Sequence, residues 1–479
     1  MQLAVGEHSL LSQDNCFLEI SDSQISVHWS SSMLTTMYAK WKLSLCGSRK
    51  FRVRHIDKDR VVLIFSSRFP PLLSTQLSVF NTDPLSKRCT DTSPNNAFGR
   101  CQTVHLTIRT DQASYPLLTS YLEKRNLFKD GNLPYVYHLT ENLLPLEDIF
   151  SAIDENLSLP VCIALRCFCS SIDPLDLSDE FKELLHTYEP NQVANALYYL
   201  EEIRCVQPDL LKDVLEAHLD DDEQPSDDLV PVTRVTVTPS RIRVYPKALE
   251  QSNTVLREFR HLQDHFIRVS FTDESGAYLP REPDAPDIHE RIKDFVTKGF
   301  MLAGLRFEYL AASNSQLREG SAWFFAATSD TKVADILQRL GNLESIKCVA
   351  KHCARIGQSF SNTIRAVEIP KDSYTMIPEV ETAEGKFCFS DGVGRMSPTL
   401  ADMIQQELEL DLLPSAVQFR FQGAKGMLCL SDKVPPGRLM ELRPSMVKYP
   451  LNEDAEREFA HLAICSVTKE IRCRLSAPL

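Results

Sequence analysis

Hydrophobic and polar residues alternate with a period of two across the first 115 residues of this chain. The runs ISVHW (residues 25–29) and VHLTI (residues 104–108) show the pattern most clearly. Successive side chains of a β-strand point to opposite faces, so the alternation predicts half-buried strands. Two further runs flank the polar triplet at residues 57–59, which predicts a β-hairpin. We therefore expect an antiparallel β-rich module over residues 1–115.

Between residues 116 and 219 the hydrophobic positions recur every three to four residues instead. Val193, Ala196, Leu197 and Leu200 fall on one face of an α-helix. This spacing predicts a helical region over residues 116–219.

An acidic segment, DDDEQPSDDL, follows this helical region. Concentrated like charge around a proline leaves no apolar face to bury, which is typical of a linker. A carboxylate metal site is the rival interpretation, but metal sites need fixed geometry and nothing in the sequence holds these side chains rigid. We assign residues 220–230 as an acidic linker.

Residues 231–370 mix both periods. Strand-like alternation covers residues 232–245 and 267–271, and an amphipathic helix around Ile288 is predicted to end near Gly299 or Gly304. The apolar runs LRFEYLA and AWFF bracket a polar loop, which predicts a β-hairpin with a long ordered loop. Two short helices are expected after it, over about residues 333–343 and 343–355.

The remaining chain divides into two parts. Residues 371–455 contain short strands interrupted by glycine and proline, a texture typical of a small barrel with sharp corners. Residues 456–479 form a divergent tail.

Charge is distributed unevenly along the 479 residues. The formal net charge is −13, yet residues 231–479 hold 32 basic and 32 acidic residues, so the first 230 residues carry the whole excess. Within residues 412–450 the basic residues outnumber the acidic ones by six to two. A surface for a polyanion is therefore expected in this part of the chain.

The cysteines and the apolar segments indicate an intracellular protein without a membrane span. The 14 cysteines include no C-x-x-C pair, so reduced and buried thiols are expected. Cys348, His352 and Cys353 lack the fourth ligand and the spacing of a structural zinc site. No run of about 18 apolar residues is present, and the first residues lack the features of a signal peptide. We expect localisation in the nucleus, the cytoplasm or both.

Three stretches place glycine or proline beside a lone cation: FCFSDGVGRMSP (residues 387–398), QFRFQGAKGMLCL (418–430) and ELRPSMVKY (441–449). Glycine lets the backbone approach a ligand closely, and Arg395 could then fork onto a phosphate. A dinucleotide site would need a third glycine where Ser397 stands. Judged by spacing alone, Lys425 is more often the solvated lysine of a turn.

These three strings resemble the cellular RNA-dependent RNA polymerases of eukaryotic RNA silencing. The upstream segments at residues 252–274, 307–325 and 355–363 resemble the same family, and the likeness covers about residues 232–449. The front half resembles the family only in layout.

The resemblance implies an α+β fold in which residues 231–370 form a slab-like segment of the polymerase core. Residues 371–455 would then form the first of two double-psi β-barrels. In the family the first barrel supplies basic residues and the second holds magnesium through a D-x-D-G-D motif. Lys425 and Lys448 match the two lysines that contact nucleotide and nascent-strand phosphates. Arg395, Arg420, Arg443 and Arg318 are expected to contact RNA, although Arg318 could equally be a structural ion-pair partner near Glu319.

The chain departs from the family in one respect, because it contains no D-x-D-G-D sequence. Phosphoryl transfer of this kind needs metal ions that neutralise the reacting oxygens. The implied function is RNA-templated synthesis of double-stranded RNA for small-RNA silencing, with a single-stranded template, nucleoside triphosphates and silencing proteins as partners. This chain would be an inactive fragment of that enzyme, binding no Mg²⁺ through its own residues. A non-catalytic RNA-binding or scaffold protein is the alternative, and an interaction module with a relic resemblance is a third interpretation.

Overall fold

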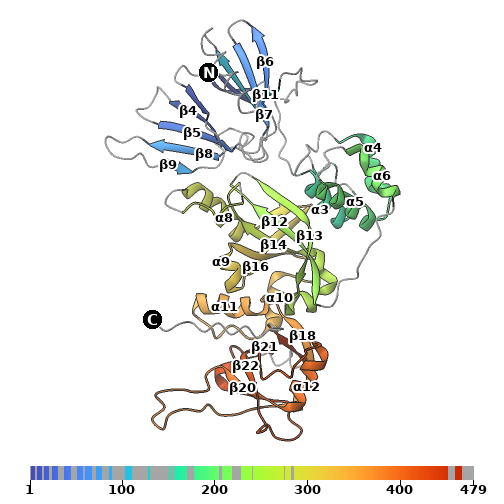
Figure 1. Cartoon of the computed structure of the whole chain (residues 1–479), viewed down its shortest axis with the longest axis vertical. Coiled ribbons are helices and arrows are strands. Elements are labelled where there is room, and N and C mark those ends of the chain that lie inside the picture. Colours follow the sequence, from blue (N-terminus) through green and yellow to red (C-terminus); the bar gives the residue numbers. More distant parts are fainter. Residues whose placement is uncertain are drawn as a thin grey trace.

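The computed structural model places four β-sheets along the chain, with one group of helices between the second and the third (Figure 1). The structure describes the backbone of the strands between residues 2 and 129. It describes the following residues with their side chains: 150–151, 153, 156–169, 177–203, 208–217, 228–239, 241–274, 276–281, 285–450 and 460–465.

Two antiparallel-rich sheets form the N-terminal module. One has the strand order β11-β6-β7-β10-β1-β2 and the other β3-β4-β5-β8-β9. Strand β6 pairs with β7 in an antiparallel register that ends at Asp57 and Arg60, so the predicted hairpin is confirmed. The strands are β1 (Gln2–Val5), β2 (His8–Ser12), β3 (Cys16–Ile20), β4 (Gln24–Ser30), β5 (Met37–Ser44), β6 (Phe51–Asp57), β7 (Arg60–Ser66), β8 (Leu72–Leu77), β9 (Ser86–Arg88), β10 (Thr103–Arg109) and β11 (Phe128–Lys129).

Four α-helices follow: α3 (Leu159–Phe168), α4 (Asp179–Thr187), α5 (Pro190–Glu202) and α6 (Leu211–Glu216), with a 3₁₀ turn η3 (Pro208–Leu210) before α6. The four apolar residues predicted to share one face of α5 are all buried. Ser178 starts α4 by accepting a hydrogen bond from the amide of Phe181. The acidic segment predicted as a linker lies outside the described residues up to residue 227, and the next strand begins at Leu229.

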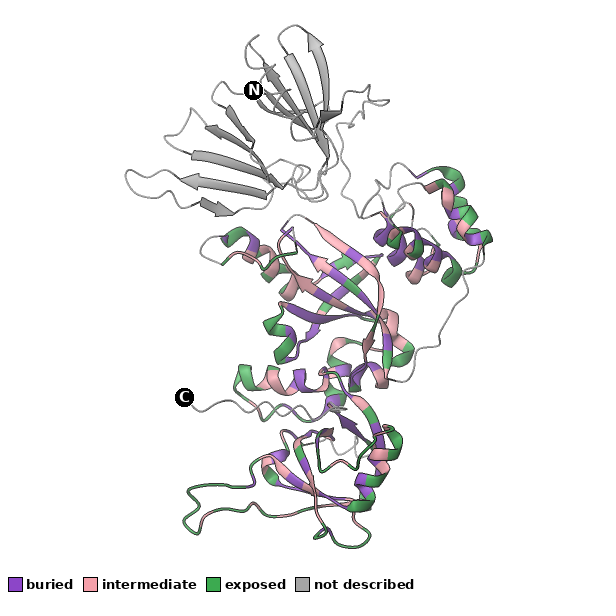
Figure 2. Cartoon of the chain, in the orientation of Figure 1, coloured by how far each residue is buried: buried purple, intermediate pink, exposed green. Residues whose placement is uncertain are grey.

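The third sheet, sheet C, has the order β13-β12-β14-β17-β16-β15. Its strands are β12 (Leu229–Val237), β13 (Ile242–Gln251), β14 (Phe266–Phe271), β15 (Phe300–Leu302), β16 (Leu305–Ala311) and β17 (Ser321–Ala326). All six residues of β17 are buried, because both faces of the sheet are covered (Figure 2). Its helices and turns are α7 (Thr254–Glu258), η4 (Arg260–His265), α8 (Pro286–Lys298), α9 (Asn314–Arg318), α10 (Val333–Leu340) and α11 (Val349–Ser359).

Most predictions for this segment match the structure, but the second short helix is displaced, because α11 covers Val349–Ser359 and not residues 343–355. Helix α8 ends at Gly299, whose φ of 70° suits only glycine without strain. Strands β16 and β17 form the predicted hairpin, and α9 orders the loop between them. Ser313 and Gln316 build a capping box at the start of α9, each side chain accepting a hydrogen bond from the other's amide.

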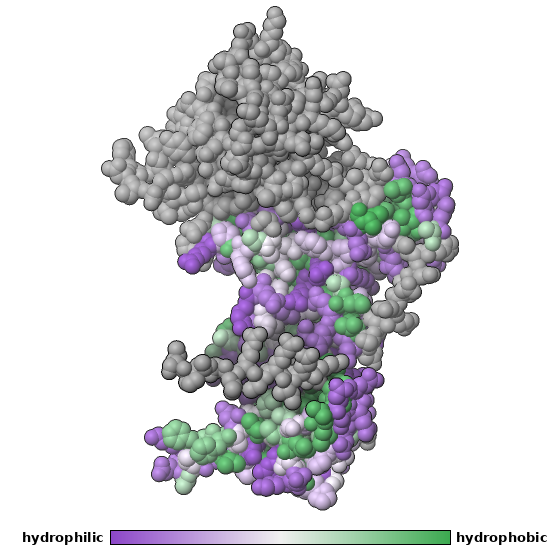
Figure 3. Space-filling model, in the orientation of Figure 1, coloured by the Kyte–Doolittle hydropathy of each residue, from purple (hydrophilic) through white to green (hydrophobic). Residues whose placement is uncertain are grey.

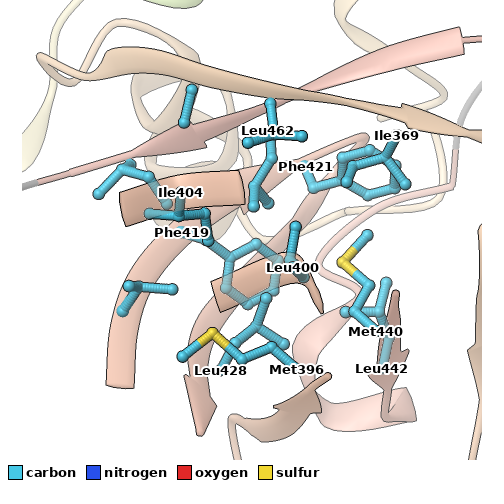
Figure 4. Close-up of a cluster of buried hydrophobic side chains, with 14 of the residues drawn as sticks. Ile369, Met396, Leu400, Ile404, Phe419, Phe421, Leu428, Met440, Leu442 and Leu462 are labelled. Carbon is cyan, nitrogen blue, oxygen red and sulfur yellow. The ribbon is translucent and has the colours of Figure 1, made fainter. Parts of the chain in front are cut away.

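The fourth sheet, sheet D, has the order β18-β24-β21-β22-β20-β23-β19, with parallel pairs β20–β22 and β19–β23. Its strands are β18 (Ile364–Pro370), β19 (Tyr374–Met376), β20 (Val393–Met396), β21 (Ala416–Phe421), β22 (Ala424–Leu430), β23 (Met440–Leu442) and β24 (Phe459–Ile464); η6 (Lys371–Ser373), α12 (Pro398–Glu407) and η7 (Pro444–Met446) lie between them. Figure 4 shows the core, in which Phe419, Leu400 and Met396 meet between α12 and the strands.

Sheet D is wider than the range predicted for it. Strand β18 begins at Ile364, and β24 pairs with both β18 and β21. The sheet therefore includes residues on both sides of 371–455, and part of the predicted divergent tail is a paired strand of this sheet. Periodicity did not reveal this, because a single six-residue strand that pairs far along the chain has no local signal of its pairing.

Sheets C and D are joined through Tyr449 and α11. The ring of Tyr449 is buried in the same hydrophobic cluster as Phe325 and Phe360 of the sheet C segment. Its hydroxyl lies 3.2 Å from the Ser359 hydroxyl at the end of α11. The amide of Asn342 donates to the Pro450 carbonyl at 2.9 Å. These contacts fix sheet D against the end of α11.

Candidate functional site

Glycines bring the three cation-bearing stretches into backbone contact. A Cβ on Gly426 would lie 2.3 Å from the Gly392 carbonyl oxygen, and one on Gly394 would lie 2.4 Å from the Glu441 carbonyl oxygen. The amide of Met427 donates to the Gly392 carbonyl at 2.9 Å. Any side chain at these two glycines would force the strands apart, so the glycines are required for close packing between stretches that are distant in sequence.

The stretch that carries Lys448 is held against the turn before Lys425. The amide of Lys448 donates to the Gly423 carbonyl at 3.0 Å. Gly423 has a φ of 77°, and a Cβ there would lie 2.4 Å from the Tyr449 carbonyl oxygen. The ammonium of Lys448 donates to the Ser445 carbonyl. Lys425 thus lies in strand β22, and Lys448 lies in the segment after η7 that the isolated bridge between Ala424 and Val447 holds beside it.

Lys425 lies directly opposite Arg420 in the antiparallel pair β21–β22. Burial lowers the pKa of the Lys425 ammonium, and the positive charges of Arg420, Arg355 and Lys448 lower it further. Each of these effects disfavours the charged form. Four cationic side chains, Arg355, Arg420, Lys425 and Lys448, therefore share one electrostatic environment, which we call the cation cluster.

The described residues place no carboxylate in an ion pair with this cluster. Within the part of the chain that the structure describes, none of its four members forms an ion pair, whereas Arg268 and Lys247 elsewhere do. The Nε atom of Arg420 is buried and has no hydrogen-bond partner among the described residues. Like charges placed opposite each other in a sheet are destabilising. Such an arrangement is suited to binding an anion with several negative oxygens, such as a phosphate chain.

The sequence did not predict Arg355 as a site residue. It lies in α11, outside the three glycine-bearing stretches, and a single arginine in a helix has no distinguishing local signal. The contact between α11 and Tyr449 places Arg355 near the cluster. Burial raises the pKa of the Tyr449 hydroxyl, and the charge of Arg355 partly offsets that rise. Only the fold reveals this neighbour.

Arg395, Arg443 and Arg318 have other partners. Arg395 pairs with the buried Glu441 at 3.2 Å. Arg443 is 5% exposed and donates from Nε to the Val393 carbonyl at 2.9 Å and from its terminal nitrogen to the Pro378 carbonyl. This burial argues against direct contact between Arg443 and RNA in this conformation.

Arg318 is exposed on α9 and donates from Nε to the Asn314 carbonyl at 3.3 Å. The ion-pair partner of Glu319 is Arg268, at 3.2 Å, and not Arg318. Arg318 is not among the charges that shift the pKa of Lys425, and its contact with RNA stays a prediction.

An apolar arm projects beside the site. Residues 377–391 form an irregular hairpin with one isolated bridge, and Phe387 and Phe389 on it are 58% and 71% exposed. Figure 3 shows a hydrophobic surface in this region, at the lower left. Contiguous exposed apolar surface is typical of an interaction site.

Glu379 anchors the base of this arm. Its carboxylate accepts hydrogen bonds from the Ser390 hydroxyl at 2.5 Å and the Ser445 amide at 2.8 Å. Burial raises the pKa of Glu379, but these bonds and one from Cys388 outweigh it and lower the pKa to about 2. Ser445 also accepts a hydrogen bond from the Gly392 amide, so Glu379 links the arm to two of the three stretches.

The described cysteines are free thiols, but not all are buried. Cys162 and Cys167 are buried as expected, whereas Cys348, Cys353 and Cys388 are exposed. This corrects the expectation of uniformly buried thiols. The described residues include no group of three or more His, Cys, Asp or Glu side chains that could hold a metal ion. They also contain no helix long and apolar enough to cross a membrane.

Comparison with known proteins identifies the class of this chain and then its family. The chain is a mixed α+β protein whose fold resembles that of a polymerase: over 67% of this chain and 37% of the other, it superposes with the RNA-dependent RNA polymerase QDE-1 from Thielavia terrestris, with a TM-score of 0.50 and 20% identity. A family model described as RNA dependent RNA polymerase matches residues 237–479, just over half of the sequence. The chain belongs to this family, and the resemblance inferred from its motifs is confirmed.

The similar proteins include plant polymerases. The probable RNA-dependent RNA polymerase SHL2 of Oryza sativa is 36% identical over 245 residues, which is 47% of this chain and 20% of that protein. RNA-dependent RNA polymerase 6 of Arabidopsis thaliana is 35% identical, with the same coverage of each chain. The probable RNA-dependent RNA polymerase 2 of Oryza sativa is 28% identical over 81% of this chain and 36% of its own length. The last alignment extends the likeness into the front half, beyond the shared layout expected there, and the chain spans only a fifth to about a third of these relatives.

Proposed function

We propose that this chain is the part of an RNA-dependent RNA polymerase that holds nucleotide and nascent-strand phosphates. The whole enzyme would copy a single-stranded RNA template from nucleoside triphosphates and so make double-stranded RNA for small-RNA silencing. The cation cluster is the observation that carries the proposal, because among the described residues its four cations have no carboxylate partner. Three of them lie in the glycine-bearing stretches, and Arg355 joins them from α11.

The cluster can act through electrostatics alone. A lysine ammonium about 4 Å from a phosphate oxygen gains on the order of 4 kcal/mol at an effective dielectric of 20, before desolvation is subtracted. Lys425 has already lost part of its hydration and lies beside other cations, so its charge is poorly compensated in the free protein. A bound phosphate would relieve that repulsion. The lysines would thereby hold the negative oxygens in place while bonds form elsewhere.

Sheet D would be the first double-psi β-barrel of the polymerase core. The parallel pairs β20–β22 and β19–β23, embedded among antiparallel neighbours, support this proposal because they require strands to cross over within a small sheet. Sheet C and its helices would be the slab that leads to the barrel. Arg420 would steady RNA next to the lysines, and Arg395 would do so through the part of its guanidinium that remains exposed.

Magnesium is expected for the whole enzyme, but the side chains described here do not fit a magnesium site. No cluster of carboxylates stands near the cation cluster among the described residues, and the D-x-D-G-D motif is absent from all 479 residues. We therefore propose that this chain alone adds no nucleotides. We also propose that the enzyme works inside the cell, in the nucleus, the cytoplasm or both, with the small-RNA silencing machinery.

The proposal can be tested by RNA binding to the full 479-residue chain. We expect a fluorescent oligouridylate to bind weakly, with an affinity that falls steeply as salt rises, because bound phosphates release counterions. The double variant Lys425→Ala and Lys448→Ala should reduce the slope of log affinity against log salt by about 1.4, since each lost single-strand phosphate contact is worth about 0.7.

Lys298→Ala is the matched control. Lys298 is exposed and pairs with Asp294, so its removal should leave the slope unchanged. A flat salt response of the wild-type chain would overturn the proposal. Competition by a nucleoside triphosphate for the same site would support the polymerase. RNA binding that no triphosphate displaces would favour the non-catalytic RNA-binding or scaffold protein instead.

A further inference from the structure

Helix α11 carries positive charge up to the edge of the cation cluster. Lys347 stands immediately before its N-cap, Cys348, and Lys351 and Arg355 follow at four-residue intervals. Lys347 and Lys351 are exposed, whereas Arg355 is half-buried. Lys351 and Arg355 are four apart on the helix and are therefore neighbours on its surface, and Lys347 lies in the extended segment that leads into the N-cap. We call these three cations the α11 row.

The row contains no compensating acid. Helix α11 has no Asp or Glu among its 11 residues, and neither lysine forms an ion pair with a described residue. Helix α8 shows the ordinary arrangement, in which exposed Lys298 pairs with Asp294 at 2.9 Å. A row of exposed, uncompensated lysines raises the local concentration of a polyanion.

The row leads to the site. Arg355 is the cation at its inner end, and the charge of Arg355 acts on both Lys425 and Tyr449. Lys351 and Arg355 are separated by about 6 Å along the helix axis, since each residue rises 1.5 Å. This separation is comparable to the length of one nucleotide in a single strand. The positive charges of Lys347, Lys351, Arg355 and Lys425 follow one another, so the α11 row is an extension of the cation cluster and not a separate basic patch.

We propose that the α11 row binds the phosphate backbone of single-stranded RNA and guides the strand to the cation cluster. The inference rests on the proposed function, because the cluster is the destination of the strand. Lys347 and Lys351 are positioning residues that touch the strand outside the reacting centre. An acidic protein segment is the competing occupant, but a segment of that kind would have no reason to continue into a phosphate site.

The test compares two charge-matched double variants of the full chain. Lys347→Ala with Lys351→Ala should weaken oligouridylate binding roughly tenfold or more at 0.1 M salt and make the salt slope shallower by about 1.4. Lys293→Ala with Lys298→Ala removes two exposed lysines from α8 and should change neither quantity.

The protein's own thiols give a second readout. Cys348 adjoins Lys347, whereas Cys353 lies on the opposite side of α11 from Lys351, about 200° around the helix. Both are exposed in the free chain. Bound oligouridylate should slow alkylation of Cys348 several-fold and leave Cys353 at its free rate. Equal protection of both thiols would contradict a strand that follows the row.

Failure of this inference can be told apart from failure of the proposed function. An α11 variant that binds like the wild type, beside a weakened Lys425 and Lys448 variant, would remove the row and leave the function standing. A wild-type chain that binds no RNA would remove both. A polyglutamate peptide that competes as well as RNA of equal charge would overturn RNA as the occupant and favour an acidic protein partner.

Discussion

Sheet C pairs its partly buried cations with carboxylates, and sheet D does the same for Arg395 but not for the cations of the cluster around Lys425. In sheet C, Arg268 lies 2.9 Å from Glu250 and 3.2 Å from Glu319, and Lys247 at its edge lies 2.8 Å from Asp264. In sheet D, Lys425 has other cations as its charged neighbours. Sheet C and its connections position the chain, whereas no carboxylate among the described residues pairs with the cluster at sheet D.

The difference indicates where a ligand is needed. A partly buried cation loses hydration, and a carboxylate partner restores most of that loss. Where the partner is missing, the free protein is less stable and an incoming anion gains more on binding. This is the trade-off expected of a functional site, where stability is reduced for the sake of binding or catalysis.

The largest predicted effect is on catalysis by the cluster. Lys425→Ala or Lys448→Ala, made in a polymerase that also includes the aspartate motif, should each lower turnover by roughly 100-fold or more, since each removes a charge held opposite phosphate. Template-dependent incorporation of labelled nucleotide measures the rate. Extension at the wild-type rate by either variant would defeat the assignment of that lysine.

The next effect concerns the paired cations of sheet C. Arg268→Ala should lower the free energy of unfolding by about 2 kcal/mol, because it leaves Glu250, which is 20% exposed, without its charged hydrogen bond. Urea denaturation measures it. Lys182→Ala, which removes an exposed pair with Asp179, should cost less than about 0.5 kcal/mol. Equal losses in the two variants would show that the sheet C pairs are no more structural than surface pairs.

Glu379 gives a pH-dependent prediction of intermediate size. Its pKa of about 2 lies below the ordinary value of a glutamate, so its ionised form stabilises the fold above about pH 4.5, and this contribution is lost as the pH falls towards 2. Glu379→Gln should therefore destabilise the chain by about 1 kcal/mol at pH 7, a value reduced for partial exposure, and by progressively less below pH 4.5.

Glu384→Gln is the control for this titration, since Glu384 is exposed on the same arm. It should change the free energy of unfolding by less than about 0.5 kcal/mol at either pH. A difference between wild type and Glu379→Gln that stays constant from pH 7 to pH 3 would exclude the carboxylate as the source of the stabilisation.

The sequence predicted local structure well because local structure has a local cause. Helix α5 follows from the spacing of its apolar residues, and the end of α8 follows from a glycine with positive φ. The motifs also predicted the pair Lys425 and Lys448. The sequence did not predict contacts between distant segments. Strand β24 pairs with sheet D, Glu441 forms an ion pair with Arg395, and α11 places Arg355 near the lysines. These depend on tertiary pairing, which no periodicity encodes.

The smallest predicted effect tests directly how much the repulsion within the cation cluster destabilises the fold. Lys425→Met keeps the length of the side chain and removes the charge, so at pH 7 it should raise the free energy of unfolding by about 0.5 kcal/mol through relief of repulsion from Arg420. The pKa of Lys425 is lowered in the folded state, so the unfolded chain holds this proton more tightly, and the penalty is full at neutral pH. This penalty must disappear as the pH rises towards the ordinary pKa of a lysine. The stabilisation by Lys425→Met should disappear over the same pH range. Lys247→Met, which removes the ion pair with Asp264, should instead destabilise the chain. If both methionine variants shift stability in the same direction, the contrast between the two sheets does not hold.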